Sequence, residues 1–217
     1  MGVEIKFCGL TRREDANHAV ALGASYVGVI FAGGPRLVTP DRAAGVLRDV
    51  PATVRRVGVF GDQDDAAIAR AVETAALDVV QLHGGWDPER VRRLGLQLER
   101  DVWPVVRIEG ALPPDWIADA FALGARTVVD TLVPGQLGGT GVALPWVELS
   151  GRLATARRRG SLVLAGGLNP DNVPVAIGAL APAVVDVSSG VESAPGIKDH
   201  GRMRAFRDAV AHSAIEI

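Results

Sequence analysis

A cysteine and an aspartate are the two residues best suited to acid and base chemistry in this sequence. Cys8 follows the apolar run 3–7, and Asp130 follows Val128-Val129. A thiolate can act as a base, and nearby helix N-termini would lower the pKa of the thiol toward the working range. A carboxylate at the end of an apolar strand is costly unless it has partners or a task. The alternatives are a small buried thiol and a carboxylate that caps a helix or braces a loop.

Two glycine-rich segments in the last third of the chain predict a phosphate site. Gly166 and Gly167 follow one apolar run, and Ser188, Ser189 and Gly190 follow the next. Glycine lets backbone N–H groups approach a phosphate closely, and the N-terminus of a following helix adds its positive end. A single glycine pair is more often only a turn, but the pairing of two such ends favours phosphate binding over turn geometry.

A few other polar residues end apolar runs. Arg36 follows Gly33-Gly34-Pro35, and its guanidinium could hold a carboxylate in bidentate fashion, although a surface arginine would look the same in sequence. The remaining candidates of this kind are Asp62, Gln81, His83 and Arg107.

The elements that must position these side chains form one repeating pattern. Eight short β-branched runs alternate with Ala/Leu/Arg-rich stretches of helical length, and the runs are continuous rather than alternating, as in strands buried on both faces. Eight such units predict an α/β protein of the (βα)8 TIM-barrel class, whose active site lies at the C-terminal ends of the strands. We found no linker, so residues 1–217 are expected to form a single domain. The eight runs are 3–7, 26–31, 54–60, 79–82, 102–108, 126–129, 162–164 and 184–187.

Capping signals predict where four helices begin. Thr11 with Glu14 has the spacing of a capping box, and three further cappers each precede a proline. These three are Thr39-Pro40, Asp87-Pro88 and Asn169-Pro170.

The connection after Asp130 is longer than a usual βα loop and rich in glycine. It is therefore a candidate lid, in which Gly139 could close over the phosphate, although a surface loop without a role is the alternative.

Composition excludes several classes of function. The net charge of −2 and the 48% apolar content are typical of a soluble globular protein, and no Lys/Arg run is longer than Arg157-Arg158-Arg159, so we expect no nucleic-acid partner. The four histidines show no ligand spacing, so no metal site is predicted. The single cysteine excludes an intrachain disulfide, and the absence of a signal peptide or long apolar run predicts a cytoplasmic protein without membrane segments.

Barrel geometry suggests what could lie between Cys8 and Asp130. In an eight-stranded barrel, strands 1 and 6 are three steps apart, so their ends should be about 14 Å apart at the backbone. The inward side chains would leave about 8 to 9 Å between them, which is enough for a sugar ring. With a phosphate held by strands 7 and 8, this arrangement would place an acid and a base on opposite sides of a phosphosugar.

Over nearly its full length the chain resembles phosphoribosylanthranilate isomerase of tryptophan biosynthesis. The resemblance implies an Amadori rearrangement of the phosphoribosyl aminal of anthranilate into an open-chain aminodeoxyribulose phosphate, without cofactor, by a monomer or homodimer. The matching segments are Lys6 to Thr11, Pro35-Arg36, Gly58 to Phe60, Val80 to Gly84, Asp130-Thr131, Gly138 to Gly141, Leu164 to Pro170, Asp186 to Glu192, Pro195-Gly196 and Lys198-Asp199.

The resemblance also implies a role for individual residues. In that family the cysteine at the position of Cys8 is the general base, and the aspartate at the position of Asp130 is the general acid. The arginine at the position of Arg36 contacts the anthranilate carboxylate, and the glycine-rich ends of strands 7 and 8 hold the phosphate. Within the matching segments, Gln81, His83 and Asp186 are further candidates for substrate binding.

Two alternatives remain at this level. One is a related barrel that converts another phosphosugar, although the families concerned usually carry a carboxylate where this chain has Cys8. The other is a phosphate-binding module without catalysis, against which the presence of both Cys8 and Asp130 argues. Gly34, Val142 and Leu144-Pro145 depart from the family pattern around the lid, so they are expected to affect substrate range more than reaction class.

Overall fold

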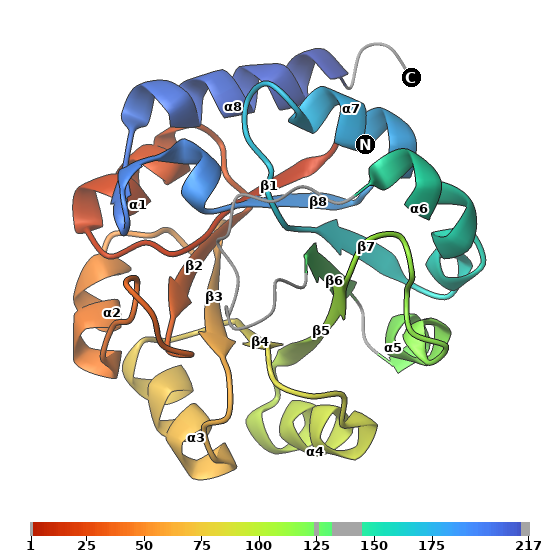
Figure 1. The fold of residues 1–217 in the computed structure, drawn as a ribbon. Coiled ribbons are helices and arrows are strands. Elements are labelled where there is room, and N and C mark those ends of the chain that lie inside the picture. Colours follow the sequence, from red (N-terminus) through yellow and green to blue (C-terminus); the bar gives the residue numbers. More distant parts are fainter. Residues whose placement is uncertain (1, 124–125, 132–144, 214–217) are drawn as a thin grey trace.

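In the computed structural model, which describes residues 2–123, 126–131 and 145–213, eight parallel strands close into a barrel surrounded by helices (Figure 1). Each strand pairs with the next in the sequence, and β1 pairs with β8 to complete the ring. The predicted TIM barrel is confirmed. The strands are β1 (Glu4–Phe7), β2 (Tyr26–Ile30), β3 (Arg55–Phe60), β4 (Val79–Leu82), β5 (Asp101–Ile108), β6 (Arg126–Thr131), β7 (Ser161–Leu164) and β8 (Val184–Val187).

The strands lie where the apolar runs predicted them. A strand that is buried on both faces needs apolar residues at consecutive positions, so its sequence is a continuous apolar run. Seven agree with the predicted runs to within one residue at each end, whereas β6 continues to Thr131 and so includes Asp130 within the strand. Between and after the strands lie the helices α1 (Arg13–Ala21), α2 (Pro40–Val46), α3 (Asp65–Thr74), α4 (Pro88–Leu98), α5 (Ile117–Leu123), α6 (Trp146–Leu153), α7 (Val173–Leu180) and α8 (His200–Ser213), and the short 3₁₀ turns Ala156–Arg158 and Ser189–Val191. In the part of the chain that the structure describes, no helix is long and apolar enough to cross a membrane.

The alternation of side chains along each strand divides the core into two parts. Residues such as Ile5 and Phe7 point outward and pack against the helices. The N-terminal half of the barrel interior is filled by a second cluster, in which Trp103 packs edge-to-face against Tyr26 and the Arg126 guanidinium lies over the Tyr26 ring. This apolar floor leaves only the C-terminal half of the interior for polar chemistry.

Two of the four predicted helix starts are confirmed. The Thr39 hydroxyl accepts a hydrogen bond from the Arg42 amide, and the Asp87 carboxylate accepts one from the Arg90 amide. Each of these side chains therefore satisfies one of the free amides at the start of its helix.

The other two predicted starts are wrong. Thr11 does not cap α1, because its hydroxyl donates to the carbonyl of Gly196, far along the chain. Asn169 precedes a turn rather than the helix itself: its side chain accepts from the amides of Asp171 and Asn172, and α7 begins only at Val173.

A small antiparallel hairpin after β8 was not predicted. It consists of β9 (Glu192–Ala194) and β10 (Ile197–Lys198), and it leads directly into α8. Strands of three and two residues are too short to show an alternating apolar pattern, so the sequence shows no sign of this hairpin. Side-chain contacts with the rest of the barrel hold it in place.

Candidate active site

A pocket of about 530 Å³ lies at the C-terminal ends of the barrel strands. It contains most of the side chains that the sequence singled out, although they come from segments up to 181 residues apart in the numbering. The predicted site residues that line it are Cys8, Arg36, Gln81, His83, Asp130, Gly166, Gly167, Asp186, Ser188 and Ser189.

The remaining candidates have other positions. Gly190 packs against the loop after β7, where an added Cβ would lie 2.0 Å from the carbonyl oxygen of Leu168. Asp62 is exposed to solvent. Gly139 and the predicted lid lie outside the described residues, between Thr131 and Pro145.

Cys8 stands at the top of β1 with little room around it. It is buried, with 6% of its surface exposed, and an added Cβ on Gly28 of the neighbouring strand would lie 2.9 Å from its Sγ. Glycine at position 28 therefore makes the space that the thiol occupies. Burial raises the pKa of the Cys8 thiol, and the positive charge of Lys6 opposes that effect.

Asp130 lies near the end of β6 in a nearly water-free environment. Its Oδ1 accepts a hydrogen bond from the Thr131 amide at 2.8 Å. Burial raises the pKa of the Asp130 carboxyl to about 6, and the nearby charge of Asp186 acts in the same direction. A carboxyl with this pKa remains partly protonated near neutral pH, so it can donate a proton.

His83, from the loop after β4, faces Asp130 across the pocket. Its Nε2 lies 3.6 Å from the Asp130 Oδ2, beyond hydrogen-bonding distance. Burial, together with the positive charges of Arg107 and Lys6, lowers the pKa of His83 to about 4. Because this pKa is below that of Asp130, the two groups do not form a charged pair at neutral pH.

Asp186, on β8, is held in place by a buried lysine that the sequence reasoning missed. Lys6 Nζ lies 2.6 Å from the Asp186 Oδ2 and donates a hydrogen bond to the Gln81 Oε1 at 3.0 Å. Lys6 is fully buried. Its position inside an apolar run, two residues before Cys8, is the signal that could have revealed it.

Arg36 belongs to a second network that sequence spacing could not reveal. Its Nε and Nη2 donate to the two oxygens of Glu192 at 2.8 and 2.7 Å. Lys198 donates to the same carboxylate and to the Ser188 carbonyl. Burial raises the pKa of the Glu192 carboxyl, but the two cations outweigh it and the pKa is lowered. Glu192 is therefore ionised and fixes the plane of the Arg36 guanidinium.

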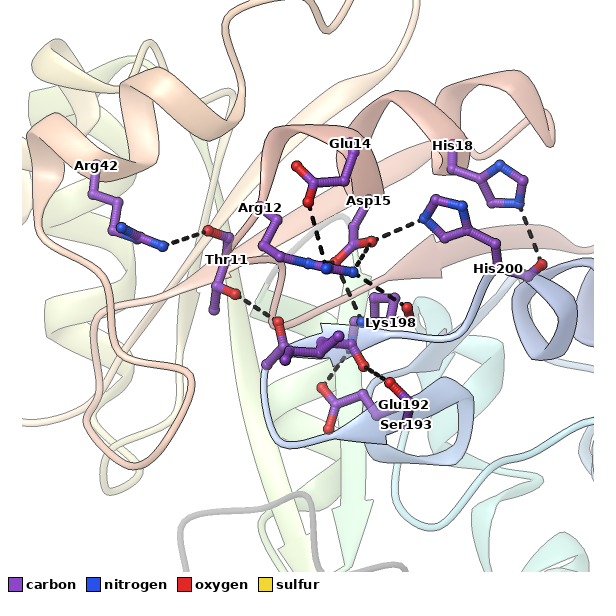
Figure 2. Close-up of polar contacts among 12 residues, drawn as sticks. Thr11, Arg12, Glu14, Asp15, His18, Arg42, Glu192, Ser193, Lys198 and His200 are labelled. Atoms are coloured by element: carbon purple, nitrogen blue, oxygen red, sulfur yellow. Dashed lines mark hydrogen bonds and ion pairs between the residues drawn. The ribbon is translucent and has the colours of Figure 1, made fainter.

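The hairpin that carries Glu192 and Lys198 is fastened to the first helix of the barrel (Figure 2). Asp15 of α1 is fully buried and accepts from the Arg12 guanidinium, from His200 and from the backbone amide of Lys198. The ring of His200 also stacks on that of His18 at 4.0 Å. These contacts hold the hairpin against the end of β1 and thus against the pocket wall, to which it contributes Pro195.

The two glycine-rich loops meet at one side of the pocket. Gly166 and Gly167 both have positive φ angles, 88° and 66°, which favour glycine. An added Cβ on Gly166 would lie 2.3 Å from the Thr131 Oγ1 and 2.9 Å from the Asp130 Oδ1. The loop after β7 therefore approaches the Asp130 carboxyl as closely as only glycine allows.

Several buried polar atoms in the pocket have no hydrogen-bond partner among the residues that the structure describes. They are both ring nitrogens of His83, the Asp186 Oδ1 and the Ser188 Oγ. Buried polar atoms are costly when unpaired, so a cluster of them in one pocket is typical of a site that binds a polar ligand. Together with a buried acid and a thiol, the pocket can bind a polar molecule and transfer protons to and from it.

Comparison with known proteins shows the family to which this chain belongs. The family described as N-(5'phosphoribosyl)anthranilate (PRA) isomerase matches residues 5–209. A relative with the name N-(5'-phosphoribosyl)anthranilate isomerase, from Paramagnetospirillum magneticum, is 41% identical over 210 residues, which are 95% of this chain and 96% of the relative.

Two solved structures extend the comparison to the fold. One is the structure of generated monomers of the dimeric phosphoribosylanthranilate isomerase from Thermotoga maritima. It superimposes on this chain with a TM-score of 0.83 at 32% identity. A phosphoribosyl anthranilate isomerase in complex with reduced 1-(o-carboxyphenylamino)-1-deoxyribulose 5-phosphate gives the same two values. Each alignment covers 97% of this chain and 99% of the other.

Proposed function

Because the chain belongs to the N-(5'-phosphoribosyl)anthranilate isomerase family, and is thus an enzyme of tryptophan biosynthesis, we propose that Cys8 and Asp130 perform its proton transfers. The substrate is N-(5-phosphoribosyl)anthranilate, and the product is 1-(2-carboxyphenylamino)-1-deoxyribulose 5-phosphate. Asp130 is the general acid and Cys8 the general base. The observation that carries the proposal is that both residues line one pocket in which the pKa of Asp130 is about 6.

The first step is ring opening. The protonated Asp130 carboxyl donates its proton to the furanose ring oxygen, the bond from that oxygen to C1′ breaks, and the nitrogen lone pair forms a Schiff base with C1′. Burial supports this role, because it keeps the carboxyl protonated to a higher pH than an exposed aspartate. The neighbouring His83 has a pKa of about 4, so it does not take the proton from the Asp130 carboxyl near neutral pH.

The second step is proton removal from carbon. The Cys8 thiolate takes the C2′ proton, and the electrons of that bond move toward the iminium nitrogen to give an enolamine. Tautomerisation to the ketone then yields the product. The positive charges of Lys6 and Lys198 favour the anionic thiolate and oppose the effect of burial.

Arg36 is the proposed partner of the anthranilate carboxylate. It lines the pocket, and its Nε and Nη2 are committed to Glu192, which leaves Nη1 as the donor for the substrate. An arginine that is already fixed by a carboxylate loses little side-chain entropy when the substrate binds. Glu192 thus prepares Arg36 for this contact.

The phosphate is assigned to the loops that follow β7 and β8. Gly166 and Gly167 bring backbone N–H groups to the pocket without a Cβ, and Ser188 and Ser189 add hydroxyl donors. Gly190 contributes indirectly, because its close packing on Leu168 holds the two loops together.

Gln81, His83 and Asp186 are proposed to contact the sugar. Asp186 keeps one oxygen, Oδ1, for a sugar hydroxyl, and His83 offers two ring nitrogens. We further propose that residues 1–217 form a single domain, that the lid carries Gly139 over the phosphate, and that the protein acts as a monomer or homodimer.

One assay tests the activity directly. Purified protein mixed with freshly prepared phosphoribosylanthranilate should abolish the substrate's fluorescence at a rate proportional to protein concentration. The double variant Cys8→Ala/Asp130→Asn should give only the background rate of substrate decay. If the wild-type protein gave no more than that background rate, the proposed function would be wrong.

A further inference from the structure

Lys6 is a lysine whose side chain lies in the interior of the barrel. Its side chain is fully buried, and it does not line the pocket. Lysine is almost never found fully buried unless it is paired, since removal of an ammonium group from water is expensive. Its partners are Asp186 on the adjacent strand β8, at 2.6 Å, and Gln81 on β4, at 3.0 Å.

The strand register places Lys6 directly beneath Cys8. Cys8 directly follows β1, two positions after Lys6, and its amide still donates to the Val187 carbonyl of β8, so the two side chains point to the same face. Both side chains also lie against the same glycine: an added Cβ on Gly28 would be 2.9 Å from the Cys8 Sγ and 3.3 Å from the Lys6 Cε. The Lys6 ammonium group therefore occupies the layer just below the thiol.

We propose that Lys6 is a positioning residue for the base, whose buried ammonium group stabilises the Cys8 thiolate while it orients Asp186 and Gln81 toward the substrate. Lys6 is fully buried and does not line the pocket, so it acts on the substrate only through its neighbours. The proposal rests on the proposed role of Cys8 as general base. It assigns to a buried lysine the task of limiting the rise in the pKa of the thiol that burial causes.

The charged groups around the thiol determine the sign of the expected effects. Lys6 on β1 and Lys198 on β10 both favour the thiolate, whereas Asp186 on β8 opposes it. The Arg36 guanidinium, which follows β2, also interacts favourably with the thiolate. Lys6 is the strongest of the favourable contributions to the Cys8 pKa, so its loss should dominate the change.

The single cysteine of the chain allows its ionisation to be measured without any substrate. Alkylation by iodoacetamide requires the thiolate, so the rate as a function of pH reports the ionisation of Cys8 alone. In the Lys6→Met variant we expect the midpoint of this profile to move to higher pH and the rate at pH 7 to fall about tenfold or more. Because the pKa of Asp130 lies below that of the Cys8 thiol, the plateau of kcat/KM between the two should fall, and its alkaline limb should move to higher pH.

Two further variants separate this role from a merely structural one. Asp186→Asn removes the charge that opposes the thiolate, so the alkylation midpoint should move to lower pH, opposite to the effect of Lys6→Met. Arg126→Met breaks an ion pair with Glu4 on the apolar floor of the barrel, so it should cost stability without moving the midpoint. Damage to the fold would move all three profiles in the same direction.

The possible outcomes decide the proposal in either direction. Opposite shifts in Lys6→Met and Asp186→Asn, with none in Arg126→Met, would support it. If Lys6→Met does not fold, the downward shift in Asp186→Asn carries the test, and its absence overturns the proposal. A folded Lys6→Met protein with the wild-type alkylation profile also overturns it. If the variants showed these shifts but the wild-type protein had no isomerase activity, the proposed function would be refuted, and the role of Lys6 in thiol ionisation would stand.

Discussion

Replacement of Asp130 by asparagine should make the protein more stable and much less active at the same time. The carboxyl is buried, and its pKa is raised from its ordinary value of 3.8 to about 6. Asparagine has nearly the same shape and can still accept the hydrogen bond from the Thr131 amide, but it has no proton to donate. The substitution therefore removes the cost of a buried charge together with the proposed acid.

The pH dependence of this gain follows from the direction of the pKa shift. Between pH 3.8 and about 6 the folded protein keeps a proton that the unfolded chain has lost. Stability of the wild type therefore falls as the pH rises through this window, and the full cost is present above it. That cost is about 2 kcal/mol at pH 5 and about 3 kcal/mol at pH 8.

Urea unfolding of wild type and Asp130→Asn at pH 5 and pH 8 measures the effect. The stability advantage of the variant should grow by about 1 kcal/mol between the two pH values, because contributions that do not depend on pH cancel. Asp65→Asn is a matched control: against the effect of burial, Arg90 and Arg93 lower the pKa of Asp65, so this carboxylate is ionised at pH 5 and at pH 8 in both the folded and the unfolded chain. Its stability difference from wild type should not change between pH 5 and pH 8.

Two results would refute the reasoning. An advantage of Asp130→Asn that is the same at both pH values would show that the carboxyl does not titrate near 6. The turnover of the variant should fall roughly 100-fold or more, the usual contribution of a general acid, with little change in substrate binding. Turnover close to that of the wild type would return Asp130 to the role of a loop-bracing carboxylate.

Three further substitutions probe the rest of the site. Cys8→Ala should abolish turnover but still interconvert the substrate anomers, which NMR can follow; loss of anomer exchange as well would contradict separate roles for the acid and the base. Arg36→Ala should weaken binding of anthranilate-bearing ligands by about 1.5 to 3 kcal/mol and leave carboxylate-free analogues unaffected, as measured by calorimetry; equal losses for both ligand types would rule out carboxylate recognition. Gly166→Ala should destabilise the fold by at least about 1 kcal/mol in urea and lower kcat, because its Cβ would collide with Thr131 and displace Asp130; an unchanged kcat and midpoint would show that the loop adapts.

The barrel was predictable because its information is local. A parallel strand buried on both faces is a continuous apolar run, and each of the eight runs became a strand. The site was predictable for a related reason: in this architecture a polar residue at the end of such a run lies at the mouth of the barrel. Cys8 and Asp130 were both found in this way.

What escaped prediction depends on contacts between distant segments. Thr11 has the sequence signature of a cap, yet its hydroxyl is used by a carbonyl 185 residues away. The pairing of Arg36 with Glu192 spans 156 residues and belongs to a hairpin too short to leave a pattern. Lys6 was missed for a different reason, because only residues at the ends of the runs were considered as candidates, whereas this lysine lies within one.

The closure of β1 against β8 has a consequence for the order in which a ribosome makes this chain. The edge of β1 and the guanidinium of Arg36 emerge early, but their partners, β8 and Glu192, are synthesised more than 150 residues later. Throughout that interval the nascent chain carries an unpaired strand edge, which is a template for association with other chains. The pocket thus forms only when translation has nearly finished, and the open edge of β1 is covered only at the same late stage.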